Sequence, residues 1–599
     1  MSQIDSQKHE DNNLYKIRHS AEHVLTHAMQ RVFGKDKFYM AMGPATDDGF
    51  YFDFEPLNDF KISEEDFPKI EAEMQKIIKE NLPIVRSEIT IDEAKKMFAN
   101  NPYKLEWLES IQNRDEVISV YTTGNQFADL CAGPHVRYTT AIKAFKLLSI
   151  AGAYWHGDEK NKMLTRIYGT AFENKADLEK YLQELEDAKL RDHRKLGKDL
   201  GLFVFSDLVG KGLPTFGPKG ATIKRELERF TIDEELKRGY HHVVTPDLAK
   251  VDLYKKSGHY PYYKDTMYPL MKVDDEELIL RPMSCPHHFM FFKSEQHSYR
   301  DLPYRIGEIA HQYRYEKSGE LSGLTRVRMF CLADAHIISA KSQAKQVIKE
   351  VLELIDFING TLGMIKGEDY RFRLSLGDRG DSKKYYKDDK SWDFAENVLR
   401  EVLTELKAPF FEAPNEAAFY GPKIDIQVKK AGGKEETAFT VQYDFVMPDR
   451  FELEFTNKEG QFERPIVIHR SSLGCVERTM AFLIEKFMGN FPVWLSPVQA
   501  KIIPITDAQH EFGNKVMQEL KDAGIRVEID DRSEKMQAKI RDAQMQKIPY
   551  MLVIGARETE SNTIAVRQRD GQDLGSISIS EFIAKIKEQI NNKSLNLIK

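Results

Sequence analysis

The amino-acid sequence predicts a multidomain protein that combines α+β and α/β folds. Its 599 residues are several times what one hydrophobic core usually holds, so roughly three or four domains are expected. Up to Phe491, long helical patterns are mixed with strand-like runs, whereas the later residues alternate short apolar strands with polar helices. This change predicts mixed α and β architectures first and a compact α/β domain last.

Composition indicates a globular protein. Apolar residues make up 41% of the sequence and charged residues 30%, which excludes a disordered chain. No apolar run approaches the ~18 residues of a membrane span, and residues 1–11 are polar. We therefore expect a cytoplasmic protein with no membrane association.

Charge and cysteine content narrow the partners and the redox chemistry. The net charge of −7 gives no global signature of nucleic-acid binding, so any RNA contact would depend on local basic surfaces. Four cysteines are too few and too scattered to staple a chain this long, so reduced thiols or metal ligands are expected. They are Cys131, Cys285, Cys331 and Cys475.

Residues 12–175 predict an α+β domain, and residues 176–199 predict a connecting helix. Tyr15–Phe33 carries apolar residues at helical spacing, and strand signals follow around Gly49–Phe54. Residues 176–199 are charged and contain no glycine or proline before Gly197, which is typical of an exposed helix.

Residues 200–493 predict a large antiparallel sheet flanked by helices, and residues 494–599 predict an α/β domain with a mostly parallel sheet. In the first of these segments, strand-like runs and long helices alternate between glycine turns. The clearest examples are the strands Lys423–Val428 and Ala438–Phe445 and the helix Ala344–Ile358. The strands expected in the last segment are Ala500–Ile505, Ile525–Ile529 and Tyr550–Ile554.

Three residues of metal-binding type lie in the middle segment: Cys285, His336 and His469. No two of them are close in sequence, so their spacing carries no metal-site signature. An ordinary buried cysteine and two ordinary histidines are therefore an open alternative.

Two runs around these residues resemble the motifs of an enzyme family. Tyr313–Glu316 together with Arg326–Arg328 is similar to motif 2 of class II aminoacyl-tRNA synthetases, and Gly474–Arg478 is similar to motif 3. The match is specifically to threonyl-tRNA synthetases and covers nearly the whole chain. A looser motif 1, usually the dimer-forming element, would occupy residues 221–246. The resemblance implies a class II catalytic core with an antiparallel sheet, an N-terminal α+β editing domain and a C-terminal α/β anticodon-binding domain.

The resemblance also implies zinc, since Cys285, His336 and His469 fall on the family's metal positions. Three protein ligands leave one coordination position open for substrate. Threonine can chelate the metal there through its amino group and its hydroxyl, whereas valine lacks the hydroxyl. Asp334 is expected to accept a hydrogen bond from that hydroxyl.

Activation of the amino acid by ATP needs cations on the phosphates. The resemblance places Arg314 on the α-phosphate and Arg478 near the γ-phosphate, together with Mg²⁺, although a lone arginine is more often a surface ion pair. His259 is the expected base for transfer to tRNA, with a surface histidine as the alternative. Further positions that match contacts to the nucleotide or to threonine are Glu316, Arg326, Tyr420, Lys423 and Gln442.

The chain departs from the family directly before Asp334. Many members carry Thr-Gln-Asp where this chain has Cys331, Leu332 and Ala333. A polar contact usually supplied by the glutamine is therefore missing, and Cys331 is not expected to be a metal ligand.

A second site is predicted in the first segment. His23 and His27 are four residues apart and thus share one helix face, which His19 extends by a turn. Together with Cys131 and His135 they are compatible with a zinc site or with a solvated histidine face.

The resemblance to the family's editing domain implies that His23, His27, Cys131 and His135 hydrolyse seryl-tRNA without an obligatory metal. Such a site is needed because one missing methyl group changes discrimination by only ~1 to 3 kcal/mol. A histidine or Asp129 would activate or orient the water.

The last segment resembles an anticodon-binding domain, in which Glu558 and Arg567 match positions that read bases, an ordinary charged surface being the alternative. The predicted protein is a homodimeric ligase for threonine, ATP and tRNA(Thr), lacking the small ubiquitin-like domain with which the family usually begins. A tRNA deacylase with a non-functional synthetase domain, a non-catalytic RNA-binding relative and a prolyl-type enzyme are the alternatives.

Overall fold

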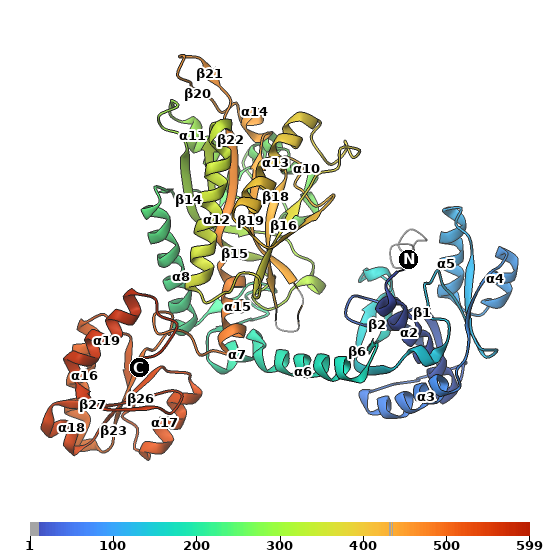
Figure 1. Cartoon of the computed structure of the whole chain (residues 1–599), viewed down its shortest axis with the longest axis horizontal. Helices are drawn as coiled ribbons and strands as arrows, with labels where there is room; N and C mark the ends of the chain where they lie inside the picture. The colour runs from blue at the N-terminus through green and yellow to red at the C-terminus, as the bar shows by residue number, and fades with distance from the viewer. Residues whose placement is uncertain (1–10, 431–432, 434, 599) are drawn as a thin grey trace. The chain divides into compact units, whose positions relative to one another are not determined.

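The computed structural model describes residues 11–430, 433 and 435–598 and divides the chain into two compact units, with the division after Leu185. Figure 1 shows the elements of each unit. No helix in these ranges is both long and apolar enough to cross a membrane.

The first unit is the predicted α+β domain. Its central helix α2 (Asn13–Phe33) begins where the Asn12 side chain accepts a hydrogen bond from the Tyr15 backbone, and one side of the helix is fully buried. This helix packs against α3 (Phe67–Lys79) and a four-stranded antiparallel sheet. The sheet order is β1 (Phe38–Met42), β2 (Phe50–Pro56), β7 (Met163–Phe172) and β6 (Ala144–Tyr154).

A smaller sheet and two helices complete this unit. The three antiparallel strands are β3 (Ile84–Glu88), β4 (Ser119–Thr123) and β5 (Phe127–Leu130). The helices are α4 (Ile91–Met97) and α5 (Pro102–Asn113). The end of β5 brings Asp129 to a pocket that His19, Glu22 and His23 of α2 also line, which is how residues far apart in sequence reach one pocket.

The predicted connecting helix is two helices. α6 (Lys175–Arg191) buries only Leu178, as expected of an exposed helix, and α7 (His193–Asp199) follows it. The break falls at Asp192, whose carboxylate accepts a hydrogen bond from the Arg194 backbone at 2.7 Å and so starts a new helix.

The second unit contains the predicted large sheet, with eight strands. Neighbouring strands from β14 to β16 are antiparallel, whereas short parallel pairs close both edges. The order is β10 (His241–His242), β14 (Tyr304–Tyr313), β15 (Met329–Ser339), β22 (Ile466–Cys475), β19 (Glu435–Asp444), β18 (Lys423–Lys429), β16 (Tyr370–Ser375) and β17 (Phe410–Ala413).

Alternation along β15 separates core from site. Cys331, Ala333, Ala335 and Ile337 enter the main hydrophobic core, which also includes the buried face of α12 (Ala344–Thr361). Asp334 and His336 therefore project from the opposite face. Other helices of this core are α8 (Pro218–Lys237), α13 (Asp389–Glu405) and α15 (Val476–Phe487).

The C-terminal sheet is mixed, so the prediction of a mostly parallel sheet was wrong in part. β23 (Ala500–Pro504) pairs in parallel with β24 (Val527–Ile529) and β25 (Tyr550–Ile554). β26 (Thr563–Gln568) then adds antiparallel to β25, and β27 (Asp573–Ser578) adds antiparallel to β26 through a short hairpin connection that contains Gly571. The helices here are α16 (His510–Asp522), α17 (Met536–Met545), α18 (Ala556–Ser561) and α19 (Ile579–Asn591).

Candidate functional site

Cys285, His336 and His469 meet on one face of the large sheet. Cys285 begins helix α11 (Cys285–Lys293), His336 lies on β15, and His469 is its direct partner on β22. One ligand atom of each lies within 4.8 Å of the others, and all three side chains are buried. Strand register therefore creates the group that sequence spacing could not reveal.

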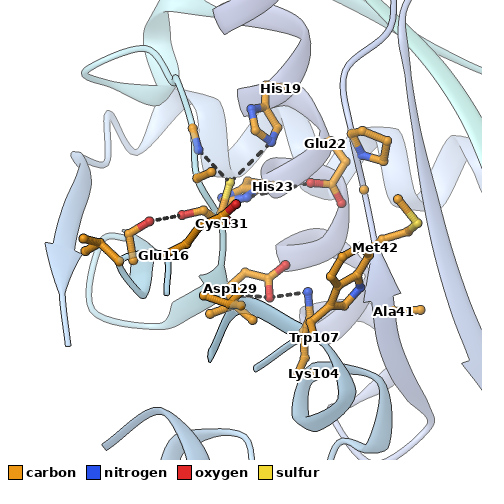
Figure 2. Close-up of a pocket in the computed structure, with 18 of the residues that line it drawn as sticks. His19, Glu22, His23, Ala41, Met42, Lys104, Trp107, Glu116, Asp129 and Cys131 are labelled. Atoms are coloured by element: carbon orange, nitrogen blue, oxygen red, sulfur yellow. Dashed lines mark hydrogen bonds and ion pairs between the residues drawn. The ribbon is translucent and has the colours of Figure 1, made fainter. Parts of the chain in front are cut away.

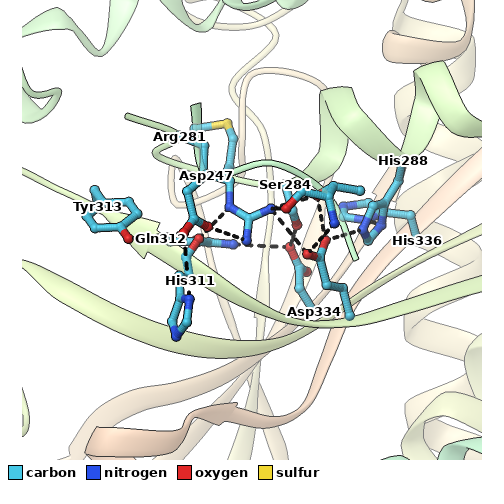
Figure 3. A network of polar contacts seen from close by, with 12 residues as sticks. Asp247, Arg281, Ser284, His288, His311, Gln312, Tyr313, Asp334 and His336 are labelled. Carbon is cyan, nitrogen blue, oxygen red and sulfur yellow. Dashed lines mark hydrogen bonds and ion pairs between the residues drawn. The ribbon is translucent and has the colours of Figure 1, made fainter. Parts of the chain in front are cut away.

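One ring nitrogen of His336 and one of His469 already have a hydrogen-bond partner. Asp444 Oδ2 lies 2.7 Å from His469 Nε2, and His288 Nδ1 lies 2.7 Å from His336 Nδ1. His288, labelled with His336 in Figure 3, in turn contacts Glu308 Oε2 through Nε2 at 3.0 Å. One nitrogen of each ring is thus fixed and the other is left toward the cysteine, which is the usual arrangement behind metal-ligating histidines. The residues fit a metal ion.

Glu308 is a firmly ionised anchor for this arrangement. Although its burial acts in the opposite direction, hydrogen bonds from His288 and Thr245 and the charge of Arg281 lower the pKa of Glu308 to about 2. Its negative charge favours a fixed proton position on His288.

Asp334 lies beside the group, where the sequence predicted it. Its Oδ2 accepts hydrogen bonds from Ser284 Oγ and, at 3.2 Å, from Gln312 Nε2. Burial raises the pKa of the Asp334 carboxyl. Donors aimed at one carboxylate oxygen fix its orientation and leave the second oxygen for a ligand.

Two predicted pocket residues and His259 line the same region. Tyr420 lies with its ring 5.3 Å from that of His469 and donates a hydrogen bond to Gln442, which is the register partner of His469 on β19. His259 packs edge-on against the Tyr420 ring at 6.3 Å and is buried, so the surface-histidine alternative was wrong. Burial, with nearby positive charge, lowers the pKa of His259 to about 3.

Arg314 and Arg478 are close enough to repel one another. Burial is the main reason why the pKa of Arg314 is lowered. The charge of Glu316 raises this pKa, and the charge of Arg478 lowers it further. Arg314 lies over the Phe330 ring, and Arg478 donates to the backbone oxygens of Thr325 and Thr437. Carboxylates offset part of this repulsion, since Glu436 lies 3.7 Å from Arg478 Nε and Glu316 attracts Arg314. Two neighbouring guanidinium groups favour a bound anion near both.

The remaining predicted nucleotide contacts are ion-paired. Arg326 donates to Glu316 at 2.9 Å, and Lys423 donates to Asp425 at 2.9 Å. These pairs would have to open or rearrange for the side chains to touch a nucleotide, so the predicted contacts stay a prediction.

The first unit holds a second cluster, made by His19, His23, Cys131 and His135. One ligand atom of each lies within 4.8 Å of the others. Cys131 Sγ lies 3.4 Å from His19 Nε2 (Figure 2). It also lies 3.3 Å from His135 Nε2 and accepts a hydrogen bond from the Gly133 backbone. Burial lowers the pKa of His19 and of His23 to about 3 and raises the pKa of Cys131 to about 12.

The predicted pairing of His23 with His27 is corrected by one helical turn. His27 stacks on Phe127 with ring centroids 5.5 Å apart and accepts from Arg31 Nε at 3.1 Å, away from Cys131. Both histidine pairs have the same spacing and all three histidines are buried, so the contacts of His19 with Cys131 and His135 are what distinguish the pairs.

The pocket beside this cluster contains charged residues that the sequence reasoning missed. Asp129 lines it as predicted and forms a buried ion pair with Lys104 at 2.6 Å (Figure 2). Glu22, between the two histidines on α2, also lines it and accepts from Thr26 at 2.8 Å. A glutamate inside a histidine pair was the available signal for Glu22, whereas nothing near Lys104 in sequence marks it.

Glu558 and Arg567 both lie beside the β26–β27 hairpin. Glu558 accepts hydrogen bonds from the Gly555 backbone and from Ser576, and Arg567 pairs with Asp573 at 3.0 Å. Both side chains are partly exposed, which leaves them accessible to a ligand.

Three family models match this chain. One described as "tRNA synthetase class II core domain (G, H, P, S and T)" matches residues 268–487, and an "Anticodon binding domain" matches residues 499–589. A "Threonyl and Alanyl tRNA synthetase second additional domain" matches residues 118–168. A threonine–tRNA ligase of Staphylococcus carnosus (strain TM300) is 50% identical over 585 residues, which are 97% of this chain and 89% of that protein. This chain belongs to the threonine–tRNA ligase family.

Other members of the threonine–tRNA ligase family agree. The relative from Geobacillus kaustophilus (strain HTA426) is 49% identical over 97% of this chain and 88% of its own length. Among solved structures, the RNA-binding domain of threonyl-tRNA synthetase from Cryptosporidium parvum Iowa II has a TM-score of 0.63 at 36% identity, covering 66% of this chain and 98% of that one. The predicted class II fold is confirmed, and these matches favour the threonine–tRNA ligase prediction over the deacylase alternative.

Proposed function

We propose that this chain selects threonine at Cys285, His336 and His469, activates it with ATP and transfers it to tRNA(Thr). We also propose that the second cluster removes serine from mischarged tRNA. The observation that best supports the first proposal is that the three ligands and Asp334 converge on one face of the class II sheet.

Zinc is the metal we assign to the three ligands. One thiol and two imidazoles with held outer nitrogens suit it, and bound zinc would supply a Lewis-acid position for an amino group and a hydroxyl. Asp334 accepts the hydroxyl hydrogen of threonine. Valine offers no such hydrogen, so it leaves Asp334 unpaired and is rejected.

Arg314 and Arg478 hold the phosphates of ATP with Mg²⁺. Their mutual repulsion is relieved by the anion, and neutralising the charge that develops on the phosphates is the main catalytic task in such transfers. Glu316, Arg326 and Lys423 complete the nucleotide pocket, and Tyr420 with Gln442 walls the threonine side.

Transfer to the ribose hydroxyl uses His259. Its Nδ1 contacts Ser257 Oγ at 2.7 Å, which fixes the ring, and its neutral state at neutral pH leaves Nε2 able to accept a proton.

Hydrolysis of seryl-tRNA uses His19, His23, Cys131 and His135, with Asp129 and Lys104 lining the pocket. The histidines are neutral and so can accept a proton from water. The role proposed for His27 in the sequence prediction passes to His19.

The remaining proposals concern recognition of the tRNA anticodon and assembly of a dimer. Glu558 and Arg567 would read anticodon bases, and α8 with β10 would form the interface of a homodimer. The first proposal is supported by the match of residues 499–589 to an anticodon-binding domain, and the second by the resemblance of residues 221–246 to motif 1.

The deciding experiment is amino-acid-dependent ATP–pyrophosphate exchange with threonine, serine and valine, in the unmodified protein and in Cys285→Ala. Exchange should be strong with threonine, weaker with serine and negligible with valine, and lost with zinc in Cys285→Ala. Exchange that persists at full rate in zinc-free Cys285→Ala would refute selection by zinc.

A further inference from the structure

Gln312 is a buried amide side chain in the wall of the proposed threonine site. The proposed activation of threonine gives it no role. It lies on β14, is 1% exposed and projects from the same face of the sheet as Asp334. Its Nε2 donates to Asp334 Oδ2 at 3.2 Å, and its Oε1 is buried without a hydrogen-bond partner among residues 11–430, 433 and 435–598. A buried acceptor left unpaired is costly, so a donor from a ligand would explain it.

The orientation of the amide follows from its partner. A carboxylate only accepts hydrogen bonds, so the nitrogen of Gln312 must face Asp334 and the oxygen must face away. Ser284 Oγ donates to the same carboxylate oxygen (Figure 3). The two donors together hold Asp334 so that Oδ1 faces the substrate.

Strand register shows where the amide lies. Gln312 pairs with Phe330 and Glu308 pairs with Asp334, so the pair Ala310 and Leu332 lies between them. To reach Asp334, the Gln312 side chain must extend over that pair. Leu332 offers no polar group there, so Gln312 is the amide at the position where the sequence comparison expects one to be missing.

We propose that Gln312 is a positioning residue for the β-hydroxy α-amino acid. Its Nε2 orients Asp334 toward the substrate hydroxyl, and its Oε1 accepts a hydrogen bond from the substrate amino group. The inference rests on the proposed selection of threonine at Cys285, His336 and His469.

The test is Gln312→Met, which keeps the length of the side chain and removes both polar atoms. In pyrophosphate exchange, the KM for threonine should rise about 10- to 100-fold, while the KM for ATP changes by less than about threefold. Zinc content and Tm should match those of the unmodified protein, which separates positioning from a structural role.

Serine provides the second readout. It shares the amino group and hydroxyl of threonine, so its KM should rise by the same factor and the threonine-to-serine preference should stay within about twofold. A changed preference would place Gln312 against the methyl group and overturn the proposal.

A double-mutant cycle with Asp334→Asn tests the link to the carboxylate. The effect of Gln312→Met on threonine KM should shrink when Asp334 is already replaced, because the two side chains act together. Strict additivity, or an unchanged threonine KM in Gln312→Met, would overturn the proposal. Absence of threonine-dependent exchange in the unmodified protein would instead refute the proposed function on which it rests.

Discussion

The two Cys/His clusters use the same side-chain types in opposite surroundings. In the cluster of Cys285, His336 and His469, proposed as catalytic and called the catalytic cluster, His336 and His469 are backed by His288 with Glu308 and by Asp444, so carboxylates lie behind both rings. In the cluster of His19, His23, Cys131 and His135, proposed for editing and called the editing cluster, His19 is backed by the Pro134 carbonyl and His135 by Ser20, which are neutral groups. Glu22 lies 3.9 Å from His23 Nε2, but burial raises the pKa of this carboxyl. Negative charge behind an imidazole strengthens it as a ligand for a cation.

The thiol of the editing cluster also has neutral partners. Cys131 already contacts two imidazoles and a backbone N–H, so its lone pairs and proton are used within the cluster. The comparison teaches that ligand identity alone does not make a metal centre. The partners behind the ligands decide whether the cluster attracts a cation or works as a neutral hydrolytic site.

Removing the metal should produce the largest difference between the activities of the two clusters. After treatment with 1,10-phenanthroline and buffer exchange, threonine-dependent exchange should fall more than about 100-fold, and hydrolysis of seryl-tRNA should stay within about twofold. Added Zn²⁺ should restore exchange. Equal loss of both activities would show that the editing cluster also needs a metal.

Replacing single histidines of α2 should sharpen the picture of the editing cluster. His19→Ala should lower seryl-tRNA hydrolysis about 100-fold, because His19 contacts Cys131, whereas His27→Ala should lower it by less than about threefold. Both variants leave exchange with threonine unchanged, which is the internal control. The reverse order of effects would restore the His23–His27 pairing.

The same two clusters show what a sequence can predict. The resemblance named Cys285, His336 and His469, which the structure brings together, but their geometry depends on the pairing of β15 with β22. On α2, equal spacing of His19, His23 and His27 left the choice of pair open, and the contacts of His19 with Cys131 and His135 decided it. The hydrophobic pattern predicted the α+β segment and the large sheet but not the antiparallel strands β26 and β27. Gln312 and Lys104 make contacts across strands and helices that no local pattern marks.

Weakening the carboxylate behind His469 should have an intermediate effect. Asp444→Asn keeps the shape of the side chain but removes the charge next to His469 Nε2, so zinc affinity should fall about 10- to 100-fold. Competition with a chromogenic chelator measures it. Asp356→Asn, which removes a carboxylate paired with Lys366 on the same unit, is the matched control and should leave zinc affinity unchanged. Equal affinities in the two variants would contradict a role for the charge.

The smallest effect is expected from the corresponding support in the editing cluster. Ser20 Oγ lies 3.1 Å from His135 Nδ1 and accepts from the Val136 backbone, so Ser20→Ala frees the His135 ring. A neutral hydrogen bond contributes only about 1 kcal/mol, so seryl-tRNA hydrolysis should fall roughly 3- to 10-fold. Single-turnover hydrolysis of seryl-tRNA measures this. A loss as large as that of His19→Ala would mean that His135 depends on a charged or metal-bound state, and the contrast between the two clusters would then fail.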